Sequence, residues 1–150
     1  MRTRRKAREV ALQVLYQLDA LKNINAEEAV DLFWGNFEAL EETKEFSSIL
    51  IEGAWNNRDS IDELIISLSE NWSLPRMSRV DKSILRLAAY ELLYCQDIPP
   101  KVTINEAIDL GKIYGSENSG AFINGILDAL YEKIQKKGPD HINDANTEQL

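Results

Sequence analysis

Residues 78–100 read SRVDKSILRLAAYELLYCQDIPP, and this stretch carries the clearest helical pattern in the chain. Ser78, followed three residues later by Asp81, has the form of a helix-capping box. Apolar side chains then recur at helical spacing until Asp97-Ile-Pro-Pro100, where proline cannot continue the backbone hydrogen bonds. The apolar positions are Ile84, Leu85, Ala88, Ala89 and Leu92. The stretch therefore predicts a capped helix with one buried face.

The same periodicity covers most of the chain, and alternation of the kind found in strands is almost absent. We therefore predict an all-α protein of about seven helices. Their expected limits are Thr3 to Leu21, a start at Asn25 with Glu28 as its capping partner, 44–57, a start at Asp59 or Ser60, a start at Ser78, Thr103 (with Glu106) to Tyr114-Gly115, and Ser116 or Ser119 to Gly138-Pro139.

Each predicted helix carries an apolar face. In the first helix, Ala7, Ala11, Val14, Leu18 and Leu21 share one side. The core positions expected in the next helices are Ala29, Val30, Phe33, Phe37 and Leu40, then Phe46, Ile49, Leu50 and Trp55, then Ile61, Leu64, Ile65 and Leu68. Those of the last helix are Ile123, Ile126, Leu127, Leu130 and Ile134.

The break at Trp72-Ser-Leu-Pro75 suggests how the helices are organised. We place there the boundary between an N-terminal lobe, about 3–75, and a C-terminal lobe, about 76–137, of a single domain 1–137. Residues 138–150 have almost no apolar side chains, so we expect a disordered tail.

Composition excludes several classes of protein. No apolar run approaches the roughly 20 residues that span a bilayer, and a single cysteine, Cys95, is typical of a cytoplasmic protein without disulfides. The single histidine, His141, lies in the predicted tail, so neither a metal site nor a Ser-His-Asp arrangement is supported. No glycine-rich phosphate loop follows a predicted strand. We therefore expect a binding protein, with no catalytic residues and no cofactor.

The distribution of charge suggests a partner. The formal net charge is −8, yet the first eight residues carry five cations and no acid. The remainder holds 12 cations against 25 acids, a net charge of −13. Such asymmetry suggests that a polyanion docks at the basic end. A solvated basic tail remains the alternative.

The first helix has a second informative face. Tyr16 projects away from the apolar side, together with Arg5, Glu9 and, farther round, Gln13. Its ring could stack on a base while the arginines hold phosphates, the combination used for single-stranded RNA. Alternatively, Tyr16 packs against the other lobe with its hydroxyl at the edge.

Two further positions have both a structural and a functional interpretation. Arg76, Arg79, Lys82 and Arg86 form a cationic stripe with Asp81 among them, where Asp81 is either a cap residue or a partner contact. Phe122 lies at the edge of the apolar face of the last helix, next to the polar turn 116–119. It is either part of the core or part of an anion-binding helix start.

Four blocks of the chain resemble the NusB family: residues 7–16, 80–92, 97–108 and 115–128, which read AREVALQVLY, VDKSILRLAAYEL, DIPPKVTINEAI and GSENSGAFINGILD. The resemblance extends from residue 3 to about 134. It implies an all-helical fold of two small packed bundles. It also implies a transcription antitermination factor that binds a short single-stranded element of nascent ribosomal-RNA transcripts. Binding would occur together with the small-subunit ribosomal protein NusE and would help RNA polymerase to read through terminators.

The resemblance also places the expected contacts. Those to RNA map onto Arg4, Arg5, Arg8, Gln13, Tyr16, Asn118 and Phe122, to which we add Lys6. Those to the protein partner map onto Tyr16 and Asp81, to which we add Arg76 and Lys82. Many relatives carry aspartate where this chain has Asn118, and the neutral amide should bind RNA at least as well. Some relatives form a homodimer that masks the RNA surface, so either a monomer or a homodimer is expected.

Two other interpretations are considered. NusB-like domains also precede the catalytic domain of ribosomal-RNA cytosine methyltransferases, but 150 residues leave no room for that domain, so we do not expect an enzyme. The alternative to RNA binding is a helical protein–protein adaptor without direct RNA contact.

Overall fold

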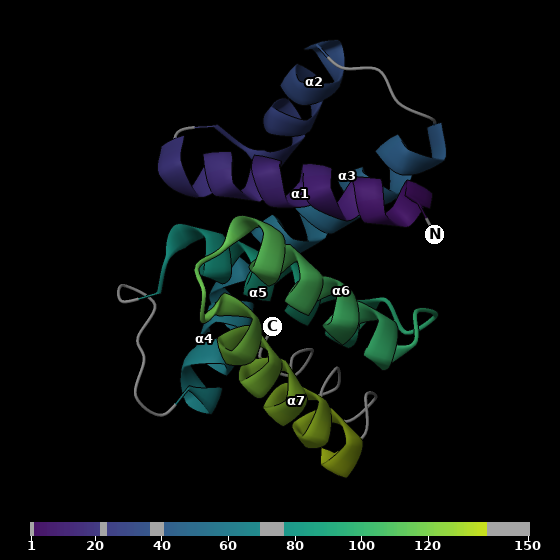
Figure 1. Cartoon of the computed structure of the whole chain (residues 1–150). Helices are drawn as coiled ribbons and strands as arrows, with labels where there is room; N and C mark the ends of the chain where they lie inside the picture. The colour runs from purple at the N-terminus through teal and green to yellow at the C-terminus, as the bar shows by residue number, and fades with distance from the viewer. Residues whose placement is uncertain (1, 22–23, 37–40, 70–76, 138–150) are drawn as a thin grey trace.

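A computed structural model describes residues 2–21, 24–36, 41–69 and 77–137, and within these ranges the chain forms seven α-helices (Figure 1). Their bounds are α1 Arg2–Leu21, α2 Ala26–Asn36, α3 Glu41–Asn56, α4 Arg58–Leu68, α5 Arg79–Tyr94, α6 Pro100–Tyr114 and α7 Ser119–Lys137. The predicted all-helical fold is confirmed.

Two helix starts follow the predicted capping chemistry. The Asn25 side-chain oxygen accepts a hydrogen bond of 2.8 Å from the backbone N–H of Glu28, and the Asn25 amide donates to the Glu28 carboxylate at 2.9 Å. The Ser78 hydroxyl accepts a 3.0 Å hydrogen bond from the backbone N–H of Asp81. Each cap satisfies a backbone donor that has no partner within its helix.

Two other predicted starts are wrong. Helix α4 begins at Arg58 after Asn57, whose side chain does not cap it, and not at Asp59 or Ser60. Helix α6 begins at Pro100, so Thr103 lies inside it. Proline is well accommodated in the first turn of a helix, where its missing N–H would have no partner. The proline pair that follows α5 therefore also begins α6.

Helix α5 occupies the centre of the molecule and packs against α1, α3, α6 and α7. Its inner side chains join those of α1 and α7 in one core, whose largest members are Leu15, Leu18, Leu50, Ile51, Ile61, Ile65, Ile84, Leu85, Leu87, Ile123, Leu127 and Leu130. Two predicted core residues are exposed instead: Leu21, the last residue of α1, and Ile49 on the outer side of α3. The spacing of apolar residues does not show where a helix extends beyond the helices that could cover it.

The second half of the chain surrounds α5. Helices α6 and α7 pack against each other and against α5, while α4 packs against both α5 and α7 as well as α3. The predicted lobe boundary near 75 falls in 70–76, and the predicted tail comprises 138–150; both lie outside the described residues, as do Phe37 and Leu40. No described helix has both the length and the apolar character that a membrane span requires.

Candidate nucleic-acid interface

Arg8 lies at the buried side of the basic end. Its side chain is 3% exposed, and its Nε and Nη2 atoms donate to the two carboxylate oxygens of Glu91 at 2.9 and 2.7 Å. Thr103 donates a further 3.0 Å hydrogen bond to the same carboxylate. A guanidinium enclosed in this way cannot meet a phosphate without disrupting the core. The structure therefore does not support the predicted RNA contact at Arg8 and gives it a structural role.

Arg5 lies one turn earlier and remains accessible. Its Nε donates to Glu106 at 3.1 Å and its Nη2 to Asp109 at 2.8 Å, both on α6. Hydrogen bonding to Glu106, together with its charge and that of Asp109, raises the pKa of Arg5. Unlike Arg8, the Arg5 side chain is about half exposed, at 48%. Arg5 is therefore available to an anion that can compete with these carboxylates.

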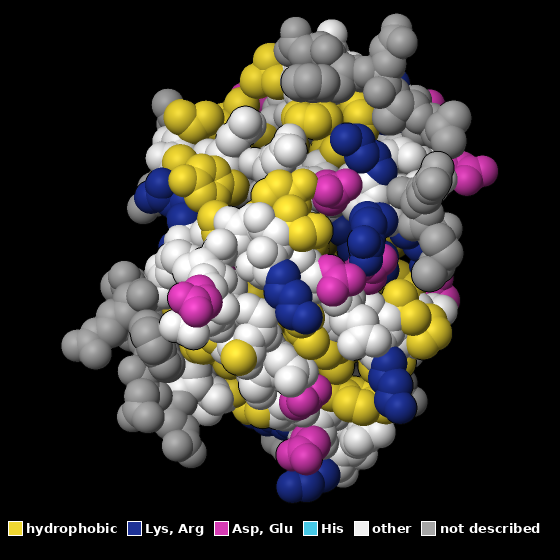
Figure 2. All heavy atoms as spheres, in the orientation of Figure 1, with side chains coloured by type: hydrophobic (Ala, Val, Ile, Leu, Met, Phe, Trp, Pro, Cys, Tyr) yellow, Lys and Arg dark blue, Asp and Glu magenta, His cyan; other side chains and the backbone are white. Residues whose placement is uncertain are grey.

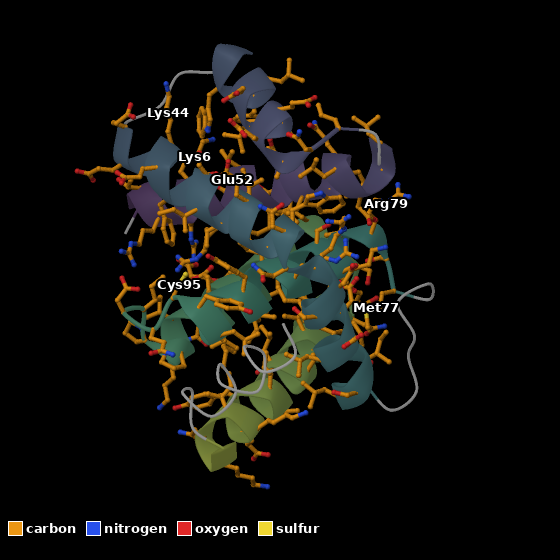
Figure 3. The ribbon with its side chains drawn as sticks, turned by 180° about the vertical axis from the view of Figure 1, so that it is seen from behind. Lys6, Lys44, Glu52, Met77, Arg79 and Cys95 are labelled. Carbon is orange, nitrogen blue, oxygen red and sulfur yellow. The ribbon has the colours of Figure 1, made fainter. Side chains whose placement is uncertain are left out.

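Arg4 and Lys6 complete the exposed cations of this end. The Arg4 guanidinium lies 4.7 Å from the centroid of the Phe46 ring and 4.0 Å from the exposed carboxylate of Asp97. Lys6 is exposed and has no salt bridge to any described residue. In Figure 3 it lies on the side where α3 presents Lys44 and Glu52. The basic end thus presents charge towards both α3 and α6.

Tyr16 borders a hollow farther along α1. Tyr16 is 39% exposed, and the guanidinium carbon of Arg79 lies 5.6 Å from its ring centroid. The hollow has a volume of about 350 Å³ and is lined by Leu12, Gln13, Tyr16, Gln17, Val80 and Tyr114. The Tyr16 ring borders residues of α5 and α6, as the packing interpretation expects. It also keeps an accessible face, as stacking on a base would require.

The surface over α1 and α6 mixes both signs of charge with hydrophobic side chains, as Figure 2 shows for one face of the molecule. Dark blue basic and magenta acidic side chains lie close to one another there, with yellow hydrophobic ones between and beside them. The Tyr114 hydroxyl donates a 2.7 Å hydrogen bond to Glu9, which joins the end of α6 to the outer side of α1. Hydrogen bonding to Glu9, supported by burial, raises the pKa of Tyr114.

The predicted cationic stripe on α5 has carboxylate partners that the sequence did not reveal. Asp19 of α1 receives Arg79 at 3.2 Å, Lys82 at 3.0 Å and Arg86 at 3.1 Å. Arg86 also binds Asp62 of α4 at 2.7 Å. Burial would raise the pKa of Asp19, but its hydrogen bonds and charge interactions with Lys82 and Arg86 lower it overall. These cations therefore join α5 to α1 and α4, and the Lys82 ammonium is engaged by the Asp19 carboxylate. Arg76 lies outside the described residues.

Asp81 is buried at the start of α5. The residue is only 8% exposed, and its Oδ1 atom has no hydrogen-bond partner among the described residues. Its backbone N–H completes the Ser78 cap. Asp81 therefore takes part in the cap through its backbone, and its burial does not support a surface contact by the Asp81 carboxylate.

Asn118 and Phe122 lie around the start of α7. Asn118 is exposed in the turn before the helix, and its carbonyl accepts a 3.1 Å hydrogen bond from the N–H of Phe122. Phe122 is half-buried and packs against the core. In Figure 1 this turn lies at the same side of the molecule as the C-terminal ends of α1 and α6. It is therefore nearer to Tyr16 than to Arg5, which lies roughly 16 Å back along α1 at 1.5 Å per residue.

Catalytic chemistry finds no support in this region. The described residues contain no group of three or more His, Cys, Asp or Glu side chains that could hold a metal ion. Burial, reinforced by the negative charges of Glu91 and Asp97, raises the pKa of the Cys95 thiol to about 11. Such a thiol is mostly protonated near neutral pH and is a poor nucleophile.

Known proteins resemble this chain over most of its length. The family model for the NusB family matches residues 5–132. The transcription antitermination protein NusB of Syntrophus aciditrophicus (strain SB) is 64% identical over 93% of this chain and 86% of its own length. NusB of Desulfatibacillum aliphaticivorans is 49% identical over 91% of this chain and 99% of its own length.

Solved structures show the same fold. A crystal form of T. maritima NusB superimposes with a TM-score of 0.78 at 40% identity, covering 86% of this chain and 90% of that one. A NusB chain crystallised with NusE and double-stranded RNA gives a TM-score of 0.79 at 28% identity, covering 89% and 98%. These matches confirm the predicted family, its helical fold and its non-enzymatic function in transcription. The chain belongs to the NusB family of transcription antitermination proteins.

Proposed function

We propose that this chain binds RNA of nascent ribosomal-RNA transcripts through the outward side of α1 and the start of α7. The observation that carries the proposal is the exposure of Arg4, Arg5 and Lys6 at one end of the helix that presents Tyr16 farther along. Cations can hold phosphates while an accessible aromatic ring stacks on a base. Gln13, Asn118 and Phe122 extend the proposed contact. Arg8 does not contact RNA in this proposal, and its buried bonds to Glu91 hold α1 against α5.

The proposed complex includes a second protein. A structural relative has been crystallised with NusE and double-stranded RNA, and we transfer NusE to this chain as its partner. The hollow beside Tyr16 and Val80 supports a protein contact there, with the Arg79 guanidinium close to the Tyr16 ring. We retain single-stranded RNA as the ligand, because stacking on Tyr16 requires an unpaired base.

Titration of a labelled ribosomal-RNA leader oligomer tests the RNA contact. Single-stranded and double-stranded forms of the oligomer should be compared, with the single-stranded form binding more tightly. Arg5→Ala and Lys6→Ala should each weaken binding and reduce its salt dependence by roughly one unit, since each removes a phosphate contact. Lys136→Ala, near the far end of α7, is the matched control. Equal affinities for all four proteins would contradict the proposed site.

A helical adaptor without RNA contact is the second candidate. A hollow of about 290 Å³ between α1 and α2 favours it, because Leu21 and Leu32 are strongly exposed at its edges. Cross-linking to single-stranded RNA at about 0.15 M salt separates the candidates, since non-specific phosphate contacts are weak there. Efficient cross-links at Tyr16 support the first candidate, and their absence with retained NusE binding supports the adaptor.

The proposal extends to the larger assembly. A complex of RNA, NusE and this chain would act on RNA polymerase to promote read-through, which places the protein in the cytoplasm.

A homodimer that covers α1 would compete with RNA. Light scattering with and without the RNA oligomer should then show a dimer that RNA converts to a smaller complex, or a monomer throughout.

A further inference from the structure

The arginines at the start of α1 face a row of carboxylates with graded exposure. Glu91, which holds Arg8, is 1% exposed, and Glu106 is 13% exposed. Asp109 is 46% exposed and Asp97 is 77% exposed. The row therefore passes from a permanent structural partner to groups that solvent and ligands can reach.

Arg5 lies at the middle of this gradient and contacts two carboxylates of different character. Glu106 accepts from both Nε and Nη2 of Arg5 and also lies 3.7 Å from Nη1 of the buried Arg8, so it belongs to the enclosed network. Asp109 contacts only the outer Nη2 atom of Arg5, at 2.8 Å. Its oxygen occupies the kind of position that a phosphate oxygen would take, because carboxylates and phosphates both accept from guanidinium N–H groups.

We propose that Asp109 competes with an RNA phosphate for Arg5 and thereby sets the RNA affinity of the basic end. Glu106 keeps the guanidinium in place, while the Asp109 carboxylate is displaced when RNA binds. The inference rests on the proposed RNA-binding function and assigns it an affinity-determining residue on α6, outside the predicted contact set.

The strength of the Arg5–Asp109 pair makes such an exchange feasible. Both side chains are about half exposed, and ion pairs of this kind contribute little net stability because water solvates their charges. The displaced carboxylate would remain close to the phosphate, however, and repel it. Both effects oppose binding, so removal of the Asp109 charge should strengthen it.

A double-mutant cycle tests the competition. RNA affinity is measured by fluorescence titration with the single-stranded leader oligomer for the unsubstituted chain, Asp109→Asn, Arg5→Ala and the double variant. Asp31→Asn, on the exposed side of α2, removes the same charge away from α6 and serves as the control. Asp109→Asn should tighten binding about two- to fivefold, in line with the weak free energies of exposed ion pairs.

The decisive comparison is made without Arg5. In the Arg5→Ala background, Asp109→Asn should change affinity no more than Asp31→Asn does. An equal gain in both backgrounds would show a general charge effect and overturn the competition, as would no gain or weaker binding in the single variant. These results leave RNA binding itself intact. Failure of the unsubstituted chain to bind RNA would instead overturn the proposed function, and the competition with it.

Discussion

Arg8 illustrates how a residue of a basic segment can belong to the core. Its guanidinium donates two hydrogen bonds to the Glu91 carboxylate inside the protein, and the Thr103 hydroxyl donates a third to the same carboxylate. Breaking such a pair is costly because one charge is left buried without a partner. Loss of either partner therefore weakens the attachment of α1 to α5.

We predict that Arg8→Ala lowers the free energy of unfolding by roughly 3–5 kcal/mol, the range found for buried pairs that lose one member. Urea denaturation followed by circular dichroism measures the loss. The double variant Arg8→Met, Glu91→Leu should lose less, because no charge remains buried. Loss of RNA affinity with unchanged stability would show that Arg8 acts at the surface instead.

Cys95 should be unreactive in the folded protein. Its pKa of about 11, against an ordinary value of 9.0, lowers the thiolate fraction at pH 8 about 100-fold. Alkylation by iodoacetamide should therefore be slower by about that factor in the native chain than in urea, with half-burial slowing it further. Equal rates in the two states would contradict the raised pKa.

At the scale of elements, Gly53 determines how closely α3 approaches α5. A Cβ atom at this position would lie 2.0 Å from a ring carbon of Tyr90, far inside contact distance. A Cβ atom at Gly125 of α7 would have no neighbouring atom within 4 Å. The two glycines therefore separate the effect of helix packing from that of helix propensity.

We predict opposite signs for alanine at these positions. Gly125→Ala should stabilise the protein by about 0.5–1 kcal/mol, because alanine favours helix over glycine. Gly53→Ala gains the same propensity but should destabilise overall by about 1–2 kcal/mol, since overpacking costs more. Thermal unfolding of both variants checks the signs. A stabilised Gly53→Ala protein would show that the Tyr90 ring moves aside easily.

Helix boundaries show what local sequence can predict. Asn25 and Ser78 were identified as helix starts because a cap needs only residues three apart. The start of α6 was missed because Pro99-Pro100 has two meanings: proline ends a helix that precedes it and suits the first turn of one that follows. Only the packing of α6 against α5 and α7 decides between them.

At the scale of the whole molecule, the basic end and its aromatic neighbour were predictable, while their carboxylate partners were not. Helical projection placed Arg5 and Tyr16 outward correctly. The acids that receive the arginines come from α5 and α6, more than 80 positions away in sequence. One signal was present: Glu91 lies within the apolar run 87–93, where an acid requires a buried cation.

The network around Asp19 connects the two halves of the molecule, since it joins α1 to α5 and, through Arg86 and Asp62, to α4. Because folding lowers the pKa of Asp19, its contribution is complete above the ordinary aspartate value of 3.8. That contribution is lost as the pH falls through the lower folded-state value.

We therefore predict that the free energy of unfolding decreases as the pH falls below about 4, and that Asp19→Asn makes this decrease shallower. At neutral pH, Asp19→Asn should cost roughly 2–3 kcal/mol, less than a fully unpaired charge would, because Arg86 keeps Asp62 as a partner. Urea unfolding from pH 3 to pH 7 measures both effects, with Asp31→Asn as the control for charge alone. If the Asp19→Asn variant loses stability just as steeply in acid as the unsubstituted chain, Asp19 does not carry the pH dependence.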